Sequence, residues 1–280
     1  MMFDRYPPKS VIVGVDGSEA AIRAARWAVD EVAGTDTPVR LLYVTEANPD
    51  ASADEAIAAL VAAEQVVHKA CSAIDEMSKP VRVETEIVHG HPVTALIAAS
   101  RSTTLLCVGD TGAAQHPDVW LGSTAKELAE SGHCSVAIIR GDRCDRGAVS
   151  EGWIVTLADE SPDGMDVLQM ALHEARHRCA PLRVLTAAGS PSHHLQDRDP
   201  LVGGPMKRCL DDYAEVEIDT FHLEGSFLDY LVEHAASIEL AVVGFARTAE
   251  LQELLGAPGA AHLRDSGFSL LVVGFERPDR

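Results

Sequence analysis

Short runs of apolar and β-branched residues alternate with helical patterns along the first half of the chain. Strands are predicted over Val11–Val15, Arg40–Thr45, Val81–Val88, Thr104–Gly109 and Ser135–Arg140. Helices are predicted between them over Ala20–Val32, Asp54–Met77, Pro92–Ser100 and Ser123–Ser131. Asp16 or Ser18 could cap the first of these helices. Apolar strands that alternate with helices indicate a parallel sheet covered on both faces, and right-handed crossovers leave few strand orders open.

The same pattern recurs in the second half. The segment Val11–Ser18 has a counterpart at Ile154–Ser161, and Leu105–Gly109 has one at Leu240–Gly244. We therefore predict an α/β protein with two tandem, doubly wound domains, each a five-stranded parallel sheet of Rossmann-like order 3-2-1-4-5. The first domain is expected over 1–141 and the second over 152–280. The join lies in the polar stretch between Gly141 and Gly147.

Composition narrows the class of protein. With 46% apolar and 24% charged residues over 280 positions, a disordered or fibrous chain is excluded. The 23 basic and 43 acidic residues give a net charge of −20, which argues against binding to nucleic acid or an anionic membrane. No secretory signal or uninterrupted membrane-spanning run is visible, and the six cysteines are scattered without a CxxC. A cytoplasmic location with reduced thiols is expected.

A ligand site is expected where the first and fourth strands of the first domain end. In an open α/β sheet, ligands bind outside the carboxyl ends of the strands, where the strand order reverses. Glycines collect at this place, at Gly109, Gly112 and Gly122, and Ser123 opens the next helix. Bare backbone and the free N–H groups of a helix start attract anions, so we predict a phosphate site.

The spacing of these residues distinguishes between nucleotide-binding families. Gly109-x2-Gly112-x9-Gly122-Ser123 matches neither GxxxxGK[ST] nor GxGxxG. It resembles the nucleotide-binding pattern of the universal stress protein superfamily, G-2x-G-9x-G-[S/T]. The segments Val13–Ser18, His89–Pro92, Leu121–Thr124 and His133–Ala137 look like that family as well.

The resemblance implies that the first domain binds ATP together with Mg²⁺. Its site residues would be Gly14, Val15, Asp16, Val44, Val108, Gly109, Thr111, Gly112, Gly122, Ser123 and Thr124. Asp16 would hold Mg²⁺ near the phosphates, and Val44 would meet adenine through its backbone. The resemblance also implies that the two domains pair through their fifth strands. We further predict a homodimer of such chains and an unknown regulatory protein partner.

The second copy departs from the pattern. Asp159 is retained, but Arg247 stands where the second glycine belongs. Gly256 follows after eight residues, and Ala257 replaces the Ser/Thr. We predict that this copy binds nucleotide weakly or not at all.

Three functions remain open at this stage. The first is a stress-response sensor or regulator that binds nucleotide. The second is a slow ATPase or nucleotide-dependent transferase that uses the same pocket, and the third is a nucleotide-free interaction scaffold. No GxSxG motif or clear general base is present, so we assign no catalytic residue. The sequence does not separate ATP from AMP or a cyclic nucleotide.

One motif in the second half of the chain would indicate a different function, a zinc protease. His173-Glu174-Ala175-Arg176-His177 matches the zinc-protease string HExxH. The buried stripe of this predicted helix runs through Val167, Leu168, Ala171, Leu172 and Ala175, so both histidines are expected in solvent. No third ligand is obvious, and we predict solvated histidines, with adventitious metal binding as the alternative to a catalytic zinc.

Overall fold

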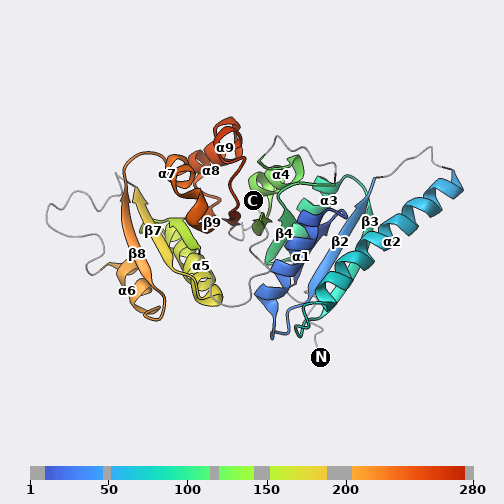
Figure 1. Cartoon of the computed structure of the whole chain (residues 1–280), viewed down its shortest axis with the longest axis horizontal. Helices are drawn as coiled ribbons and strands as arrows, with labels where there is room; N and C mark the ends of the chain where they lie inside the picture. The colour runs from blue at the N-terminus through green and yellow to red at the C-terminus, as the bar shows by residue number, and fades with distance from the viewer. Residues whose placement is uncertain (1–9, 47–51, 114–119, 142–151, 188–203, 275–280) are drawn as a thin grey trace, which may run out of the picture. The chain divides into compact units, whose positions relative to one another are not determined.

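The computed structural model describes residues 10–46, 52–113, 120–141, 152–187 and 204–274 and divides into two compact units (Figure 1). The first unit comprises 1–117, 121–140 and 274–280, and the second comprises 118–120 and 141–273. The predicted join at 141–147 lies outside the described residues except for Gly141. Each unit is described by itself.

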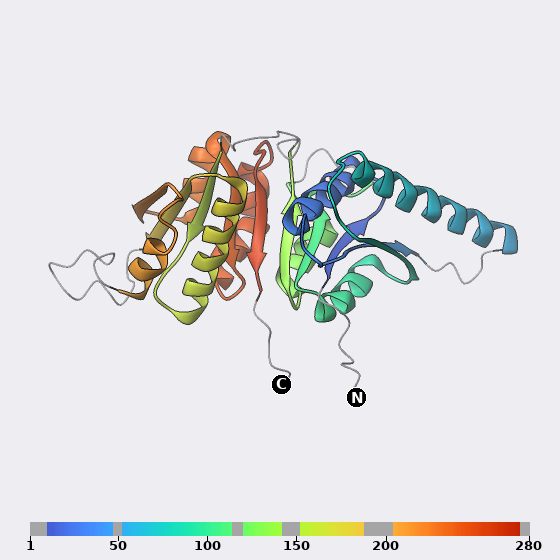
Figure 2. The same cartoon turned by 90° about the horizontal axis from the view of Figure 1, so that it is seen from below.

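The first unit contains one parallel five-stranded sheet. Its strands are β1 (Val11–Val15), β2 (Val39–Thr45), β3 (Val83–His89), β4 (Leu105–Gly109) and β5 (Ser135–Ile139). Its helices are α1 (Glu19–Val32), α2 (Ala53–Asp75), α3 (Pro92–Ala99) and α4 (Ser123–Ser131), with a 3₁₀ turn η1 (Ser100–Ser102) after α3. The strand order is β3-β2-β1-β4-β5, as predicted. Helices α1 and α2 pack together on one face of the sheet, and α3 and α4 pack together on the other (Figure 2).

The start of α1 is fixed by side-chain capping. The backbone N–H of Ala21 donates to Ser18 Oγ at 3.1 Å, and Ser18 N–H donates to Asp16 Oδ1 at 3.0 Å. Of the two predicted caps, Ser18 therefore caps the helix, and Asp16 supports the turn that leads to it. Alanines such as Ala24, Ala25 and Ala28 are fully buried along α1, so the helix lies close to the sheet.

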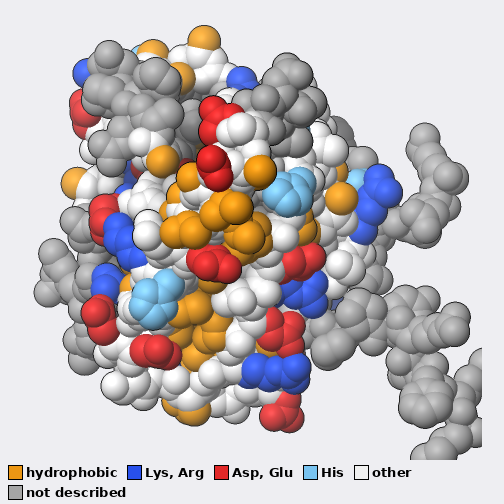
Figure 3. All heavy atoms as spheres, turned by 90° about the vertical axis from the view of Figure 1, so that its right-hand side faces the viewer, with side chains coloured by type: hydrophobic (Ala, Val, Ile, Leu, Met, Phe, Trp, Pro, Cys, Tyr) orange, Lys and Arg blue, Asp and Glu red, His pale blue; other side chains and the backbone are white. Residues whose placement is uncertain are grey.

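Helix α2 is buried along its second half only. Ser52 and Glu55 form a capping box at its start, and Ala63, Val67, Ala70, Ala73 and Ile74 are buried. Every residue from 52 to 62 is exposed, including Ile57 at 63% and Leu60 and Val61 at 46% each. The first turns of α2 extend beyond the sheet of the first unit (Figure 2), and hydrophobic side chains are visible on the side from which α2 projects (Figure 3).

Among the described helices, α2 is also long and apolar enough to cross a membrane by length and composition, with a mean hydropathy of 1.3 and 28% of the window buried. A core helix of an α/β domain passes the same test, and the second half of α2 packs against β2 and α1.

The second unit repeats the architecture. Its strands are β6 (Trp153–Leu157), β7 (Leu182–Ala187), β8 (Ile218–Leu223), β9 (Ile238–Gly244) and β10 (Ser269–Val273). Its helices are α5 (Pro162–Arg178), α6 (Pro205–Asp211), α7 (Phe227–His234), α8 (Thr248–Leu255) and α9 (Ala257–His262), with a 3₁₀ turn η4 (Ala235–Ser237). The order β8-β7-β6-β9-β10 is the same 3-2-1-4-5 order, with all strands parallel. No disulfide joins the cysteines among the residues that the structure describes.

Candidate functional site

The predicted site residues of the first unit gather at the carboxyl edge of its sheet. Strands β1 and β4 lie side by side, with Val13 opposite Cys107, and they end at Val15 and Gly109. Strands β2 and β5 flank this central pair on either side, so the winding of the chain reverses between β1 and β4. The loops after these two strands carry Asp16 and the segment 110–122, which is where the topology predicts a ligand.

Asp16 connects the two loops. Its Oδ1 accepts a hydrogen bond from Ser18 N–H at 3.0 Å, and its Oδ2 accepts one from Ala113 N–H at 2.8 Å. A Cβ atom added at Gly112 would lie 3.0 Å from Asp16 Oδ2, so only glycine leaves this oxygen uncrowded. The structure thus brings together Asp16 and Gly112, which are 96 positions apart in the sequence.

The start of α4 faces the same region with no side-chain cap. Its N-cap residue is Gly122, and no described side chain accepts from the first turn. Gly122 N–H donates to Asp110 O at 2.7 Å, which brings the two ends of the 110–122 segment together. Ser123 is exposed and Thr124 is half-buried, so their hydroxyls and the first N–H groups of α4 form a local site for an anion.

Asp110 anchors this segment through charges that sequence analysis did not single out. The residue is 6% exposed, and its carboxylate lies 3.5 Å from Arg23 Nη2 and 3.6 Å from Arg140 Nε. Burial raises the pKa of Asp110, although Arg140 and Arg23 both act to lower it. The ion pairs join α1, the end of β5 and the start of the segment, so Asp110 is a positioning residue for the candidate site.

Gly109 has a packing role besides the one predicted from the sequence. A Cβ atom at this position would lie 2.6 Å from the backbone carbon of Ala20 and 2.9 Å from Ala21 N. Strand β4 therefore needs glycine here because α1 crosses it at backbone contact. The space at Gly14 is less restricted than at Gly109. A Cβ atom at Gly14 would lie 3.2–3.3 Å from side-chain atoms of Val108 and Leu96, and not against backbone atoms.

The apolar residues predicted for the site lie in the sheet itself. Val15 and Val108 are 4% and 5% exposed, so their side chains belong to the core. Val44 is half-buried in β2 opposite Val88 of β3. Any contact of Val15 and Val108 with a ligand would therefore be made by backbone atoms.

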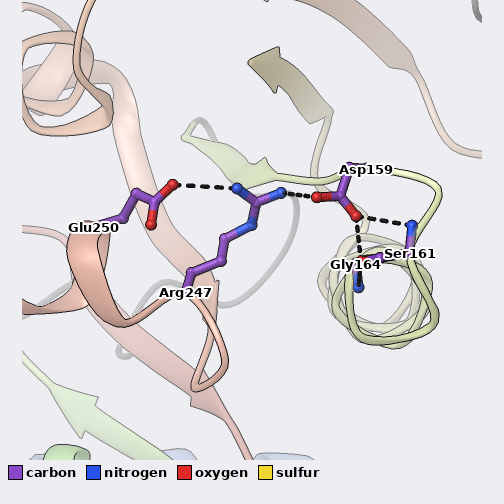
Figure 4. Close-up of polar contacts among 5 residues, drawn as sticks. All are labelled: Asp159, Ser161, Gly164, Arg247 and Glu250. Atoms are coloured by element: carbon purple, nitrogen blue, oxygen red, sulfur yellow. Dashed lines mark hydrogen bonds and ion pairs between the residues drawn. The ribbon is translucent and has the colours of Figure 1, made fainter. Parts of the chain in front are cut away.

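The second unit has an aspartate at the equivalent strand end, with a different partner. Asp159 Oδ1 accepts hydrogen bonds from Ser161 N–H at 2.9 Å and from Ser161 Oγ, which repeats the turn at Asp16. Its Oδ2 accepts from Arg247 Nη2 at 2.7 Å, and Arg247 Nη1 donates to Glu250 Oε1 at 3.2 Å (Figure 4). Asp159 Oδ2 thus accepts from the Arg247 guanidinium. In the first unit, the equivalent oxygen, Asp16 Oδ2, accepts from the backbone N–H of Ala113.

A cavity of about 430 Å³ lies beside this ion-pair network, lined by the starts of α5 and α8. Among the described residues that line it, Asp159, Asp163 and Glu250 are acidic and Arg247 is the one cation. A phosphate group would meet three carboxylates here and a guanidinium that is already paired. Weak or absent nucleotide binding by the second copy stays a prediction, and this charge balance gives a physical reason to expect it.

Comparisons with known proteins decide the family. A family model described as "Universal stress protein family" matches residues 8–140. A universal stress protein of Mycobacterium tuberculosis is 39% identical over 279 residues, which cover 98% of this chain and 99% of that protein. The chain belongs to the universal stress protein family. Because the match spans both copies of the repeat, it is a tandem-domain universal stress protein.

Other relatives of this universal stress protein agree. A second M. tuberculosis universal stress protein is 35% identical over 269 residues, 95% of this chain and 96% of the relative. The crystal structure of a universal stress protein from Archaeoglobus fulgidus superposes with a TM-score of 0.69 at 15% identity, covering 95% of this chain and 96% of that chain. At that identity the superposition shows the fold alone, and it confirms the predicted α/β class.

The ion pair of the second unit leads to a prediction for this universal stress protein. Burial works against ionisation of Asp159, but the Ser161 hydrogen bonds and the charge of Arg247 together hold its pKa below the usual value. Arg247→Ala is therefore expected to raise the pKa of Asp159, and only in part, because the Ser161 bonds remain. A carboxylate pH titration by NMR measures this.

The sign of the stability effect follows from the lowered pKa. A lowered folded-state pKa contributes stability above the unfolded-state pKa, and this stability is lost as the pH falls through the folded-state value. Arg247→Ala should therefore lower the free energy of unfolding of the second unit most above the unfolded-state pKa of Asp159, and the difference from wild type should shrink as the pH falls through the folded-state pKa. An unchanged Asp159 titration in the variant would show that the guanidinium does not act on this carboxylate.

Proposed function

We propose that the first unit of this universal stress protein binds an adenine nucleotide with Mg²⁺ and acts as a nucleotide-dependent sensor or regulator. The observation that carries the proposal is the convergence of the Asp16 carboxylate, the backbone at Gly112 and Ala113, and the uncapped start of α4. These groups come from two adjacent strand ends at the point of the sheet where ligands bind in folds of this class.

The phosphates would lie against the start of α4. No side chain among the described residues accepts from the N–H groups of the first turn, and the Ser123 and Thr124 hydroxyls add donors. The net charge of −20 does not oppose this arrangement, because the field of a helix start acts locally. Arg23 and Arg140 add positive charge around the buried Asp110, the first residue of the 110–122 segment.

The donor set fits Mg²⁺ bound together with a nucleotide. Asp16 is exposed and supplies a carboxylate oxygen, a hard ligand, beside Ala113. No group of three or more metal-binding side chains occurs among the residues that the structure describes. A magnesium ion would therefore take most of its ligands from phosphate oxygens and water, as it commonly does. When bound, it would neutralise charge between Asp16 and the phosphates.

A regulatory role requires that the nucleotide favour one arrangement of the segment over another. The hydrogen bond from Ala113 N–H to Asp16 Oδ2 is the contact that a ligand cation or phosphate would perturb first, because it occupies the carboxylate oxygen beside Gly112. Such a change alters the populations of two states only through a difference in affinity. Domain pairing through the fifth strands, a homodimer, a regulatory partner and a cytoplasmic location stay predictions.

The site can be tested by adding one methyl group. Gly112→Ala places a Cβ atom 3.0 Å from Asp16 Oδ2, so the carboxylate must move. We expect the affinity for Mg-ATP to fall about fivefold, which corresponds to about 1 kcal/mol, at the lower end of the cost of overpacking. Isothermal titration calorimetry on the full chain measures the change.

Gly267→Ala is the matched control. Nothing lies within 4 Å of a Cβ atom at Gly267, in the second unit, so the same substitution there should leave the affinity unchanged. Equal affinities of wild type and Gly112→Ala would place the nucleotide elsewhere.

A further inference from the structure

The HExxH motif lies on α5 of the second unit, in the C-terminal half of that helix. His173 and His177 are one helical turn apart, and both are exposed; the His173 side chain is 53% accessible. Their rings are stacked, with centroids 6.2 Å apart and planes inclined by 7°. Side chains four residues apart on a helix lie on one face, so the two imidazoles can approach the same ion.

The side chain of Glu174, the glutamate of the motif, is buried in the second unit. Its side chain is 3% accessible, and Oε2 accepts a hydrogen bond from Arg178 Nε at 3.0 Å. Arg178 Nη1 in turn lies 4.0 Å from Glu239 Oε1 on β9. In the protease motif the glutamate must act on water at the metal, whereas this one is buried in an ion-pair network.

We propose that His173 and His177 chelate one divalent transition-metal ion at the surface of α5. Neutral imidazole suits Ni²⁺, Cu²⁺ and Zn²⁺. Nδ1 of His173 lies 4.0 Å from Glu174 Oε1, so Nε2 is the nitrogen left for the metal. Since the described residues offer no group of three or more ligands, the site is bidentate, and water completes the coordination. It binds metal and does not hydrolyse peptides.

Nickel is the probe that tests the site. A non-thiol reducing agent keeps the described cysteines as thiols; such an agent would reduce Cu²⁺, whereas Ni²⁺ remains divalent. The full chain is titrated with NiCl₂ by calorimetry, alongside His173→Gln, His177→Gln and the double variant. Each single variant should lower the Ni²⁺ affinity of the tightest site at least about tenfold. Removing a group that only hydrogen-bonds to a metal ligand already costs about this much metal affinity, so removing a ligand should cost no less.

The pattern among the variants separates chelation from independent binding. Because either substitution destroys the chelate, most of the loss should appear in each single variant, and the double variant should lose much less affinity than the sum of the two single losses. His262→Gln is the control, since His262 is an exposed helical histidine of the same unit with its Nδ1 2.8 Å from Pro258 O; its variant should bind like wild type. Ni²⁺ should also raise the unfolding temperature of wild type and not of the double variant.

Two results would overturn the proposal. One is a single variant that retains wild-type Ni²⁺ affinity; the other is additive losses in the double variant. Circular dichroism without metal checks that the variants fold, as their exposed positions predict.

Discussion

Replacing Gly109 by alanine is expected to destabilise the first unit by about 3 kcal/mol, the upper end of the cost of overpacking. The added methyl group would lie 2.6 Å from both the backbone carbon and the Cβ of Ala20. These atoms belong to the first turn of α1, whose neighbouring alanines are buried against the sheet, so the helix cannot move away without losing its packing. The effect comes from the fold and does not depend on any ligand.

Hydrogen–deuterium exchange resolved by segment measures this effect. Protection of β4 and α1 should fall, while β6 and β9 of the second unit keep theirs. Gly112→Ala is the control for stability, because Gly112 is exposed and its methyl group would approach one carboxylate oxygen only. If Gly109→Ala unfolds like wild type, α1 does not lie against β4 as described.

Asp16→Asn is expected to lower the affinity for Mg-ATP about thirtyfold to a hundredfold. An amide cannot replace the carboxylate as a magnesium ligand of equal strength, and charged hydrogen-bonding groups contribute about 2–3 kcal/mol. The isosteric side chain can still accept from Ser18 N–H, so the turn after β1 should persist. Without magnesium, the loss for ATP should stay below about threefold, since only the bond to Ala113 N–H changes.

Calorimetric titrations with Mg²⁺ and with a chelator compare the two conditions. Ser18→Ala is the matched control: it removes the cap of α1, at a cost of about 1 kcal/mol in stability, and leaves the carboxylate in place. Its Mg-ATP affinity should be close to that of wild type. Equal losses for Asp16→Asn in both conditions would mean that Asp16 shapes the loop and does not hold the metal.

The alternation of strands and helices could be predicted because both patterns are local. Strands such as β1 and β5 are apolar at nearly every position, as buried parallel strands are, and α4 was predicted with its observed bounds, Ser123–Ser131. The handedness of crossovers leaves few strand orders open, and the approach of Asp16 to Gly112 follows once the order is 3-2-1-4-5. The edge of the sheet where the candidate site lies is therefore predictable from local sequence patterns.

Pairings between distant side chains could not be predicted. Arg23, Asp110 and Arg140 come from three elements, and nothing in their sequence neighbourhoods shows that they meet. The arginine at position 247 was recognised as a break in the glycine pattern, but its bond to Asp159 appears only once the strand ends are side by side. Gly109 was assigned to the phosphate site, and its contact with α1 could not be seen without the crossing of helix and strand.

The number of Mg-ATP molecules bound per chain tests the central claim most directly. The account predicts one site, which remains in Asp159→Asn and is lost or strongly weakened in Asp16→Asn. Two sites of similar affinity, or a single site that Asp159→Asn removes, would contradict it, as would no binding at all.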